Sequence, residues 1–129
     1  MNKQKKKIIL VAEDQPSLMS ALSDKLTQAG FEVIEAFNGE DCLVAVDKYN
    51  PDLILLDIVM PKMDGMTVLE KLKSDKDKKD IPIIMLTNLS SFEDIQKATE
   101  KGAHDYLVKT DWSLEDIVKK IKERLGMEK

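Results

Sequence analysis

The chain alternates between short runs of apolar residues and longer stretches in which apolar residues return every three or four positions. The apolar runs occupy residues 8–12, 31–37, 53–56, 83–86 and 106–108. The first, third and fourth runs are continuously apolar, which is typical of strands covered by helices on both faces. The run at 31–37 partly alternates between apolar and polar residues, as in a strand near a sheet edge. We therefore expect five strands, with the continuously apolar ones at the centre.

The stretches between the runs have the spacing and the boundary residues of amphipathic helices. Pro16 suits the first turn of one helix, and Gly30 suits its C-terminal cap. Three further helices are expected over residues 38–49, 65–74 and 92–101. The last helix lies between a capping-box pattern, Ser113 to Asp116, and Gly126.

Strands and helices that alternate in this way predict an α/β fold, because parallel strands need crossover connections and these are almost always right-handed. We expect a doubly wound, five-stranded parallel sheet with helices on both faces. The leading topology for five such units is the flavodoxin-like strand order 2-1-3-4-5.

The length of 129 residues predicts one domain over residues 1–129, with residues 1–7 as a basic leader and no output domain. The formal net charge of −4 disfavours a surface built for nucleic acid or for an anionic membrane. The apolar segment after the basic leader is too short for a signal peptide or a membrane span, so we expect a cytoplasmic protein. The single cysteine, Cys42, falls in a helical pattern and is interpreted as a small buried hydrophobe.

Polar residues follow the apolar runs at the points where the chemistry of such a sheet is expected, outside the carboxyl ends of its strands. Glu13 and Asp14 follow the first run, Asp57 the third, Thr87 the fourth and Lys109 the fifth. Each has an ordinary alternative explanation: a helix cap for Asp14 or Thr87, a turn for Asp57, an exposed position for Lys109. For any one of these residues considered alone, the ordinary explanation remains open.

Together, the strand-end residues predict a metal and phosphoryl site. Carboxylates about 4 Å apart repel by roughly 4 kcal/mol at an effective dielectric near 20, so a fold gains nothing from gathering three of them unless a cation binds. Carboxylate oxygens without histidine or thiol nearby suit Mg²⁺. A bound divalent ion leaves one carboxylate free to act as a nucleophile. Lys109 and Thr87 would complete the anion site with an ammonium and a hydroxyl.

The chain resembles the receiver family of two-component signalling, in particular its stand-alone, chemotaxis-type members. The resemblance rests on ILVAEDQP, LILLDIVMPKMDGMTVLEKL, IPIIMLTN and GAHDYLVK, which appear in this order and span nearly the whole chain. It implies that Asp57 accepts a phosphoryl group and that Asp14 and Asp57 bind Mg²⁺ together with the backbone carbonyl of Val59. Glu13 would support the metal through water.

The same resemblance implies that Thr87 and Lys109 contact the phosphoryl group, and that Thr87 and Tyr106 act as a conformational switch. The implied partners are a histidine kinase or a histidine phosphotransfer protein as donor, and a downstream protein that binds the fourth helix, fifth strand and fifth helix. The sequence departs from the family after Lys109, where the family's proline is replaced by Thr110 and Trp112 follows one residue later than the family's aromatic. We therefore expect no cis peptide at Lys109-Thr110.

The switch is not expected to be an enzyme beyond one self-phosphorylation and slow dephosphorylation. Three alternative functions compete with it. A Mg²⁺-dependent phosphatase of the haloacid dehalogenase type needs a second acid two residues after the nucleophile, where this chain has Val59. A small flavodoxin needs a hydroxyl- and glycine-rich phosphate loop after the first strand, where Glu13 and Asp14 would repel the phosphate. The third alternative is the receiver fragment of a longer transcriptional regulator.

Overall fold

Five parallel strands form one sheet in the order β2-β1-β3-β4-β5 in the computed structural model, which describes residues 5–127. The strands are β1 (Ile8–Ala12), β2 (Glu32–Ala36), β3 (Leu53–Leu56), β4 (Ile83–Thr87) and β5 (Asp105–Val108). The predicted fold class and strand order are confirmed. Residues 1–4 of the expected basic leader lie outside the described residues.

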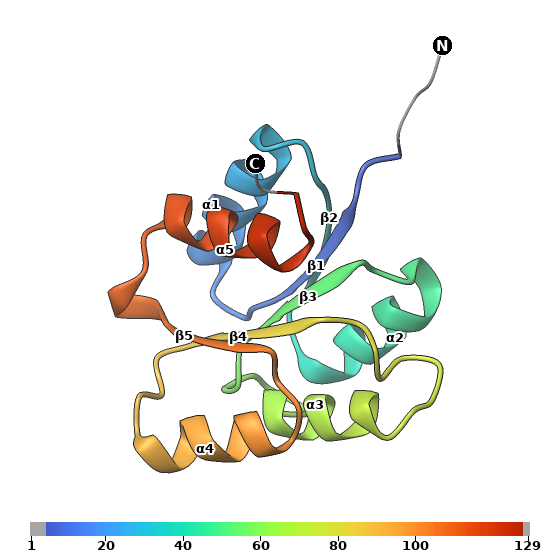
Figure 1. Ribbon diagram of the computed structural model, residues 1–129, viewed down its shortest axis with the longest axis vertical. Helices are drawn as coiled ribbons and strands as arrows, with labels where there is room; N and C mark the ends of the chain where they lie inside the picture. Colours follow the sequence, from blue (N-terminus) through green and yellow to red (C-terminus); the bar gives the residue numbers. More distant parts are fainter. Residues whose placement is uncertain (1–4, 128–129) are drawn as a thin grey trace.

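Helices cover both faces of the sheet, as Figure 1 shows. They are α1 (Pro16–Gln28), α2 (Gly39–Tyr49), α3 (Gly65–Lys73), α4 (Phe92–Glu100) and α5 (Leu114–Arg124), with a short 3₁₀ helix, η1 (Lys109–Asp111), between β5 and α5. Helices α1 and α5 lie on one face, and α2, α3 and α4 lie on the other. This is the doubly wound arrangement expected from the sequence.

The sheet separates two hydrophobic cores. Every residue of β3 and β4 is buried, and so is every residue of β1 except Ile8. Strand β2 lies at the edge and is buried only at Ala36, which agrees with its alternating sequence. Cys42 is fully buried on the α2 side, and this burial raises the pKa of its thiol to about 12. The prediction that Cys42 acts as a small hydrophobe is confirmed.

The helix boundaries follow local capping chemistry. The side chains of Asn38, Asp64, Ser91 and Ser113 each accept a hydrogen bond from a main-chain N–H in the first turn of the helix that follows. Gly30, just past α1, has a φ of +98° and adopts the left-handed conformation expected of a cap. The predicted helices therefore begin and end within a residue or two of their expected limits.

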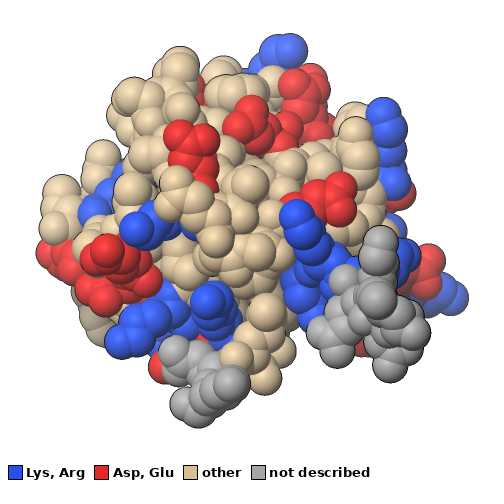
Figure 2. All heavy atoms as spheres, turned by 90° about the horizontal axis from the view of Figure 1, so that it is seen from above, with Lys and Arg blue, Asp and Glu red and all other residues tan. Residues whose placement is uncertain are grey.

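Acidic and basic side chains are interspersed on the face that Figure 2 shows, which is the side of α1 and α5. That face presents no wide area of one sign, in line with the small negative net charge. Among residues 5–127, no helix is both long enough and apolar enough to cross a bilayer.

Candidate functional site

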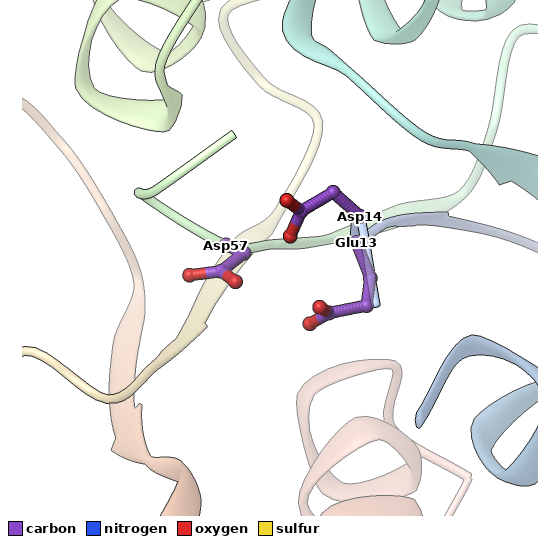
Figure 3. Close-up of side chains that lie close together, drawn as sticks. All are labelled: Glu13, Asp14 and Asp57. Atoms are coloured by element: carbon purple, nitrogen blue, oxygen red, sulfur yellow. The ribbon is translucent and has the colours of Figure 1, made fainter. Parts of the chain in front are cut away.

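Three carboxylates meet at the carboxyl ends of β1 and β3, which are neighbouring strands paired in register. Figure 3 shows Glu13 and Asp14 leaving adjacent backbone positions in different directions while Asp57 faces them from the next strand. Each offers an oxygen within 4.8 Å of the others. Glu13 and Asp57 are buried, with 1% and 4% of their surfaces exposed, whereas Asp14 is exposed. The predicted cluster therefore exists, with two carboxylates below the surface and one at it.

The loop between β3 and α3 folds back onto Asp57, and the sequence Met-Asp-Gly within it explains how. The Gly65 N–H donates to the carbonyl of Ile58 at 2.7 Å. A Cβ on Gly65 would stand 2.1 Å from the carbonyl oxygen of Asp57, so only glycine permits this approach. Asp64 caps α3 by accepting from the N–H of Thr67 at 2.9 Å. These contacts hold the backbone around Asp57 and Val59 in place.

Lys109 reaches the cluster from the end of β5. Its Nζ lies 2.8 Å from Oδ2 of Asp57 and 2.9 Å from Oε1 of Glu13. The other oxygen of Glu13 accepts from the main-chain N–H of Gln15 at 3.0 Å, and Oδ1 of Asp57 accepts from the N–H of Val59 at 3.3 Å. One ammonium faces three carboxylates, so an excess of negative charge remains at this edge.

The electrostatics of the cluster follow from burial and from these pairings. Burial raises the pKa of Glu13, and the hydrogen bonds from Lys109 and Gln15 reduce this rise without cancelling it. Burial alone would lower the pKa of Lys109, but its hydrogen bonds to Asp57 and Glu13 outweigh that effect and raise it. Lys109 thus stays charged and screens the two buried carboxylates from each other.

A cavity of about 250 Å³ opens onto the cluster. It is lined by Asp14, Gln15, Asp57, Val59, Thr87, Asn88 and Lys109. The possible metal ligands in its wall include the carboxylates of Asp14 and Asp57, and no histidine or thiol among residues 5–127 lines it. Such oxygen ligands suit a hard divalent cation such as Mg²⁺. Val59, which also lines the cavity, is 59% exposed. The site therefore offers carboxylate oxygens suited to a divalent cation in a cavity that the ammonium of Lys109 also lines.

Thr87 and Tyr106 are joined through one residue of the loop after β4. The main-chain N–H of Leu89 donates to Oγ1 of Thr87 at 3.4 Å, and the Tyr106 hydroxyl donates to the carbonyl of Leu89 at 2.6 Å. Thr87 is fully buried, and Tyr106 is partly buried against the core on the α4 side. Burial is the first cause that raises the pKa of Tyr106 to about 12, so its hydroxyl remains a donor at neutral pH. The two expected switch residues are thus connected by hydrogen bonds to the main chain of Leu89.

Most of the ordinary explanations for these residues do not match the structure. The N-cap of α1 is Gln15, whose side chain makes no capping bond, and the N-cap of α4 is Ser91, so neither Asp14 nor Thr87 caps a helix. Lys109 is not simply exposed, since only 11% of its side-chain surface is accessible. Asp14, Thr87 and Lys109 instead share one feature, since all three line the cavity.

The link after Lys109 departs from the family as expected. Lys109, Thr110 and Asp111 form η1, and no peptide bond among the described residues is cis. Trp112, at the end of η1, packs against the core on the α1 and α5 side, with the ammonium of Lys120 lying 5.8 Å from the centre of its ring. Trp112 therefore anchors this link to α5.

Comparison with known proteins identifies the family. The sequence model of the response regulator receiver domain matches residues 9–122. The chain belongs to this family, whose members are phosphoryl-accepting switches of two-component signalling. The resemblance predicted from the sequence motifs, and the general function that it implies, are confirmed.

Solved structures show the same fold over nearly the whole chain. The chemotaxis protein CheY4 of Vibrio cholerae is 30% identical, with a TM-score of 0.85 over 92% of this chain and 98% of its own. The phosphorylated cyanobacterial phytochrome response regulator RcpA is 29% identical, with a TM-score of 0.84 over 97% of this chain and 98% of its own.

Curated relatives are longer proteins. The "Probable transcriptional regulator ycf27" of Porphyra purpurea is 45% identical over 109 residues, which are 84% of this chain and 43% of that protein. The DNA-binding dual master transcriptional regulator RpaA of Synechocystis sp. is 35% identical over 114 residues, 88% of this chain and 47% of that protein. The chain thus spans less than half the length of these two relatives.

Sequence reasoning named the carbonyl of Val59 but missed other main-chain groups of the site. The N–H and C=O of Leu89 and the N–H of Gln15 bind functional side chains, yet no residue type signals such a role. The pairing of Glu13 with Lys109 was also unforeseen, because Glu13 was expected to face a metal-bound water. Glu13 holds the ammonium beside Asp57.

Added Mg²⁺ should raise the melting temperature of the protein at constant ionic strength, because a cation relieves the excess negative charge at the cluster. At ten times the dissociation constant the gain is about 1.4 kcal/mol for one site. Asp14→Ala should abolish most of this gain, whereas Asp24→Ala, an exposed acid on α1, should retain it. A melting temperature of the parent that is insensitive to millimolar Mg²⁺ would rule out the cation site.

Proposed function

We propose that Asp57 is the residue that accepts the phosphoryl group. The observation that carries this proposal is the position of its carboxylate, which borders the open cavity and lies 2.8 Å from the Lys109 ammonium. In the proposed step an oxygen of Asp57 forms a bond to phosphorus, while the bond between phosphorus and the donor's histidine nitrogen breaks and the imidazole leaves. Later hydrolysis returns the Asp57 carboxylate and inorganic phosphate.

Asp14, Asp57 and the carbonyl of Val59 are the proposed Mg²⁺ ligands, with Glu13 as a supporting carboxylate. When bound, Mg²⁺ would neutralise charge on the carboxylates and on the incoming phosphoryl oxygens. Lys109 is already held at the cavity wall by its two ion pairs, and it needs only to exchange one carboxylate oxygen for a phosphoryl oxygen. The buried Thr87 hydroxyl is proposed to donate to a second phosphoryl oxygen.

The proposed output depends on the connection from Thr87 through Leu89 to Tyr106. If the Thr87 hydroxyl turns toward a phosphoryl group, its contact with the Leu89 N–H changes, and the loop that also holds the Tyr106 hydroxyl must respond. Tyr106 lies on β5, between α4 and α5 in Figure 1. We propose that the surface of α4, β5 and α5 carries this change to a protein target.

The proposed donor is a histidine kinase or a histidine phosphotransfer protein, as the family implies, and the proposed compartment is the cytoplasm. We propose that residues 1–129 form one receiver unit that acts through protein contacts and not through nucleic acid or membrane. The receiver is not a conventional enzyme. We further propose that its own chemistry is limited to one phosphoryl transfer and slow dephosphorylation, because Val59 stands where a phosphatase would need a second acid.

A second arrangement is favoured by the longer relatives. In the transcriptional regulators that match, the similar segment is less than half of the protein. The same receiver could serve as one part of such a regulator, with the surface of α4, β5 and α5 acting on an attached output domain. The coding sequence that follows Lys129 distinguishes the two arrangements.

Asp57→Asn should abolish acyl phosphate formation and preserve the fold, because the amide has nearly the same shape but lacks a nucleophilic carboxylate. Each protein is incubated with acetyl phosphate and Mg²⁺ and then weighed intact by mass spectrometry. The parent and the control Asp24→Asn should each gain the mass of one phosphoryl group. An equal gain by Asp57→Asn would show that another residue is the acceptor.

Phosphorylation should alter amide hydrogen exchange from residue 92 to residue 121, beyond the loops of the site itself. The comparison uses the protein with and without beryllofluoride and Mg²⁺. Thr87→Ala should still show changes near Asp57 but should lose those in β5 and α4, since the connection through Leu89 is cut. Full changes in the Thr87→Ala variant would contradict the proposed route.

A further inference from the structure

Two residues that directly precede strands fasten the sheet in the same way at its amino ends. Before β3, the N–H of Asp52 donates to the carbonyl of Ile8 at 2.8 Å, and Oδ2 of Asp52 accepts from the N–H of Ile8 at 2.7 Å. Before β5, the N–H of His104 donates to the carbonyl of Ile83 at 2.8 Å, and Nδ1 of His104 accepts from the N–H of Ile83 at 3.2 Å. Each pair of bonds is a two-point clasp that joins the start of one strand to its neighbour.

The two clasps differ in what a proton does to them. A carboxyl group retains an acceptor oxygen whether or not it is protonated. An imidazole nitrogen accepts only while it is unprotonated, because both ring nitrogens of the charged form are donors. The bond from Ile83 therefore requires neutral His104 with its hydrogen on Nε2. A second proton would place two N–H groups face to face.

We propose that His104 is a proton-sensitive clasp, whose neutral imidazole fastens the start of β5 to the start of β4 and whose protonation releases that bond. The consequence reaches the functional site through the strand itself. Two residues after His104 comes Tyr106, and β5 leads directly into Lys109. Strand β5 carries the switch residue Tyr106 and positions the ammonium of Lys109. Loosening its first residues would therefore affect both.

The charges that face His104 also favour its neutral form. His104 is exposed to solvent overall, and the partial burial of its ring is the largest cause that lowers its pKa. The positive charges of Lys73 at the end of α3 and Arg124 at the end of α5 lower it further. Asp105 opposes this effect. Its carboxylate is engaged by Arg124, at 3.0 Å from Nε and 3.1 Å from Nη2. Protonation of His104 would therefore create a third positive charge close to those of Lys73 and Arg124.

The sign of the pH dependence follows. The folded protein holds the pKa of His104 below 6.5, the value of a free histidine side chain, so the unfolded chain takes up the proton first. The stabilisation by the clasp is complete above about pH 6.5 and is lost as the pH falls through the pKa of the folded state. The proposal thus predicts a loss of stability on mild acidification.

The test compares melting temperatures of the parent, His104→Asn and His104→Ala at about pH 8 and about pH 5. Between these pH values the melting temperature of the parent should fall further than that of His104→Asn, whose amide oxygen accepts without titrating. His104→Ala lacks an acceptor at either pH, so it should be less stable than the parent at pH 8 without the additional loss at pH 5. Equal losses in the parent and in His104→Asn would overturn the proposal.

A second measurement needs no variant, because His104 is the only histidine of the chain. Its ring proton resonances in an NMR titration should report a pKa below 6.5, and the amide resonance of Ile83 should move with the same midpoint. The amide of Ile8, held by the carboxylate of Asp52, should not follow that midpoint. A His104 ring that titrates at or above 6.5, or an Ile83 amide that does not respond to it, would refute the clasp.

Discussion

The gathering of three carboxylates at one edge of the sheet is the constraint on which the rest of the site depends. Glu13, Asp14 and Asp57 offer oxygens within 4.8 Å of one another, and two of the three are buried. Gathering carboxylates in this way costs free energy unless positive charge lies nearby, and Lys109 supplies part of it through ion pairs to Glu13 and Asp57. The remaining negative charge makes the edge receptive to a divalent cation.

The fold holds this cluster by burying the strands that carry it. The central strands β1, β3 and β4 are covered on both faces, so the residues that follow them have little freedom to move apart. The close approach of Gly65 to Asp57 fixes the adjoining loop in the same manner. The more adjustable part of the site is the segment after β4, where single hydrogen bonds connect Leu89 to Thr87 and Tyr106. A rigid acceptor beside a loop held by a few polar contacts is the physical basis of the proposed switch.

The sequence was sufficient to predict the fold and the residues that line the site, because parallel strands bring their carboxyl ends to one edge. Asp57 and Lys109 are 52 positions apart, yet both directly follow apolar runs and their side chains lie 2.8 Å apart. What the sequence could not predict depends on rotamers and on the main chain. Residue types alone do not show that Lys109 pairs with Glu13 or that the main chain of Leu89 binds Thr87 and Tyr106. The hydrogen bond from Ile83 to His104 likewise depends on how the starts of two strands lie side by side, which no local sequence pattern shows.

The most direct test of the central claim is to locate the acyl phosphate chemically. After incubation with acetyl phosphate and Mg²⁺, reduction with borohydride converts a phosphorylated aspartate into homoserine, which peptide mass spectrometry assigns to a position in the chain. We expect homoserine at position 57 and none at position 14, although both aspartates line the same cavity. Homoserine at position 14, or a stable phosphoryl adduct that yields no homoserine at all, would contradict the assignment of Asp57 as the acceptor.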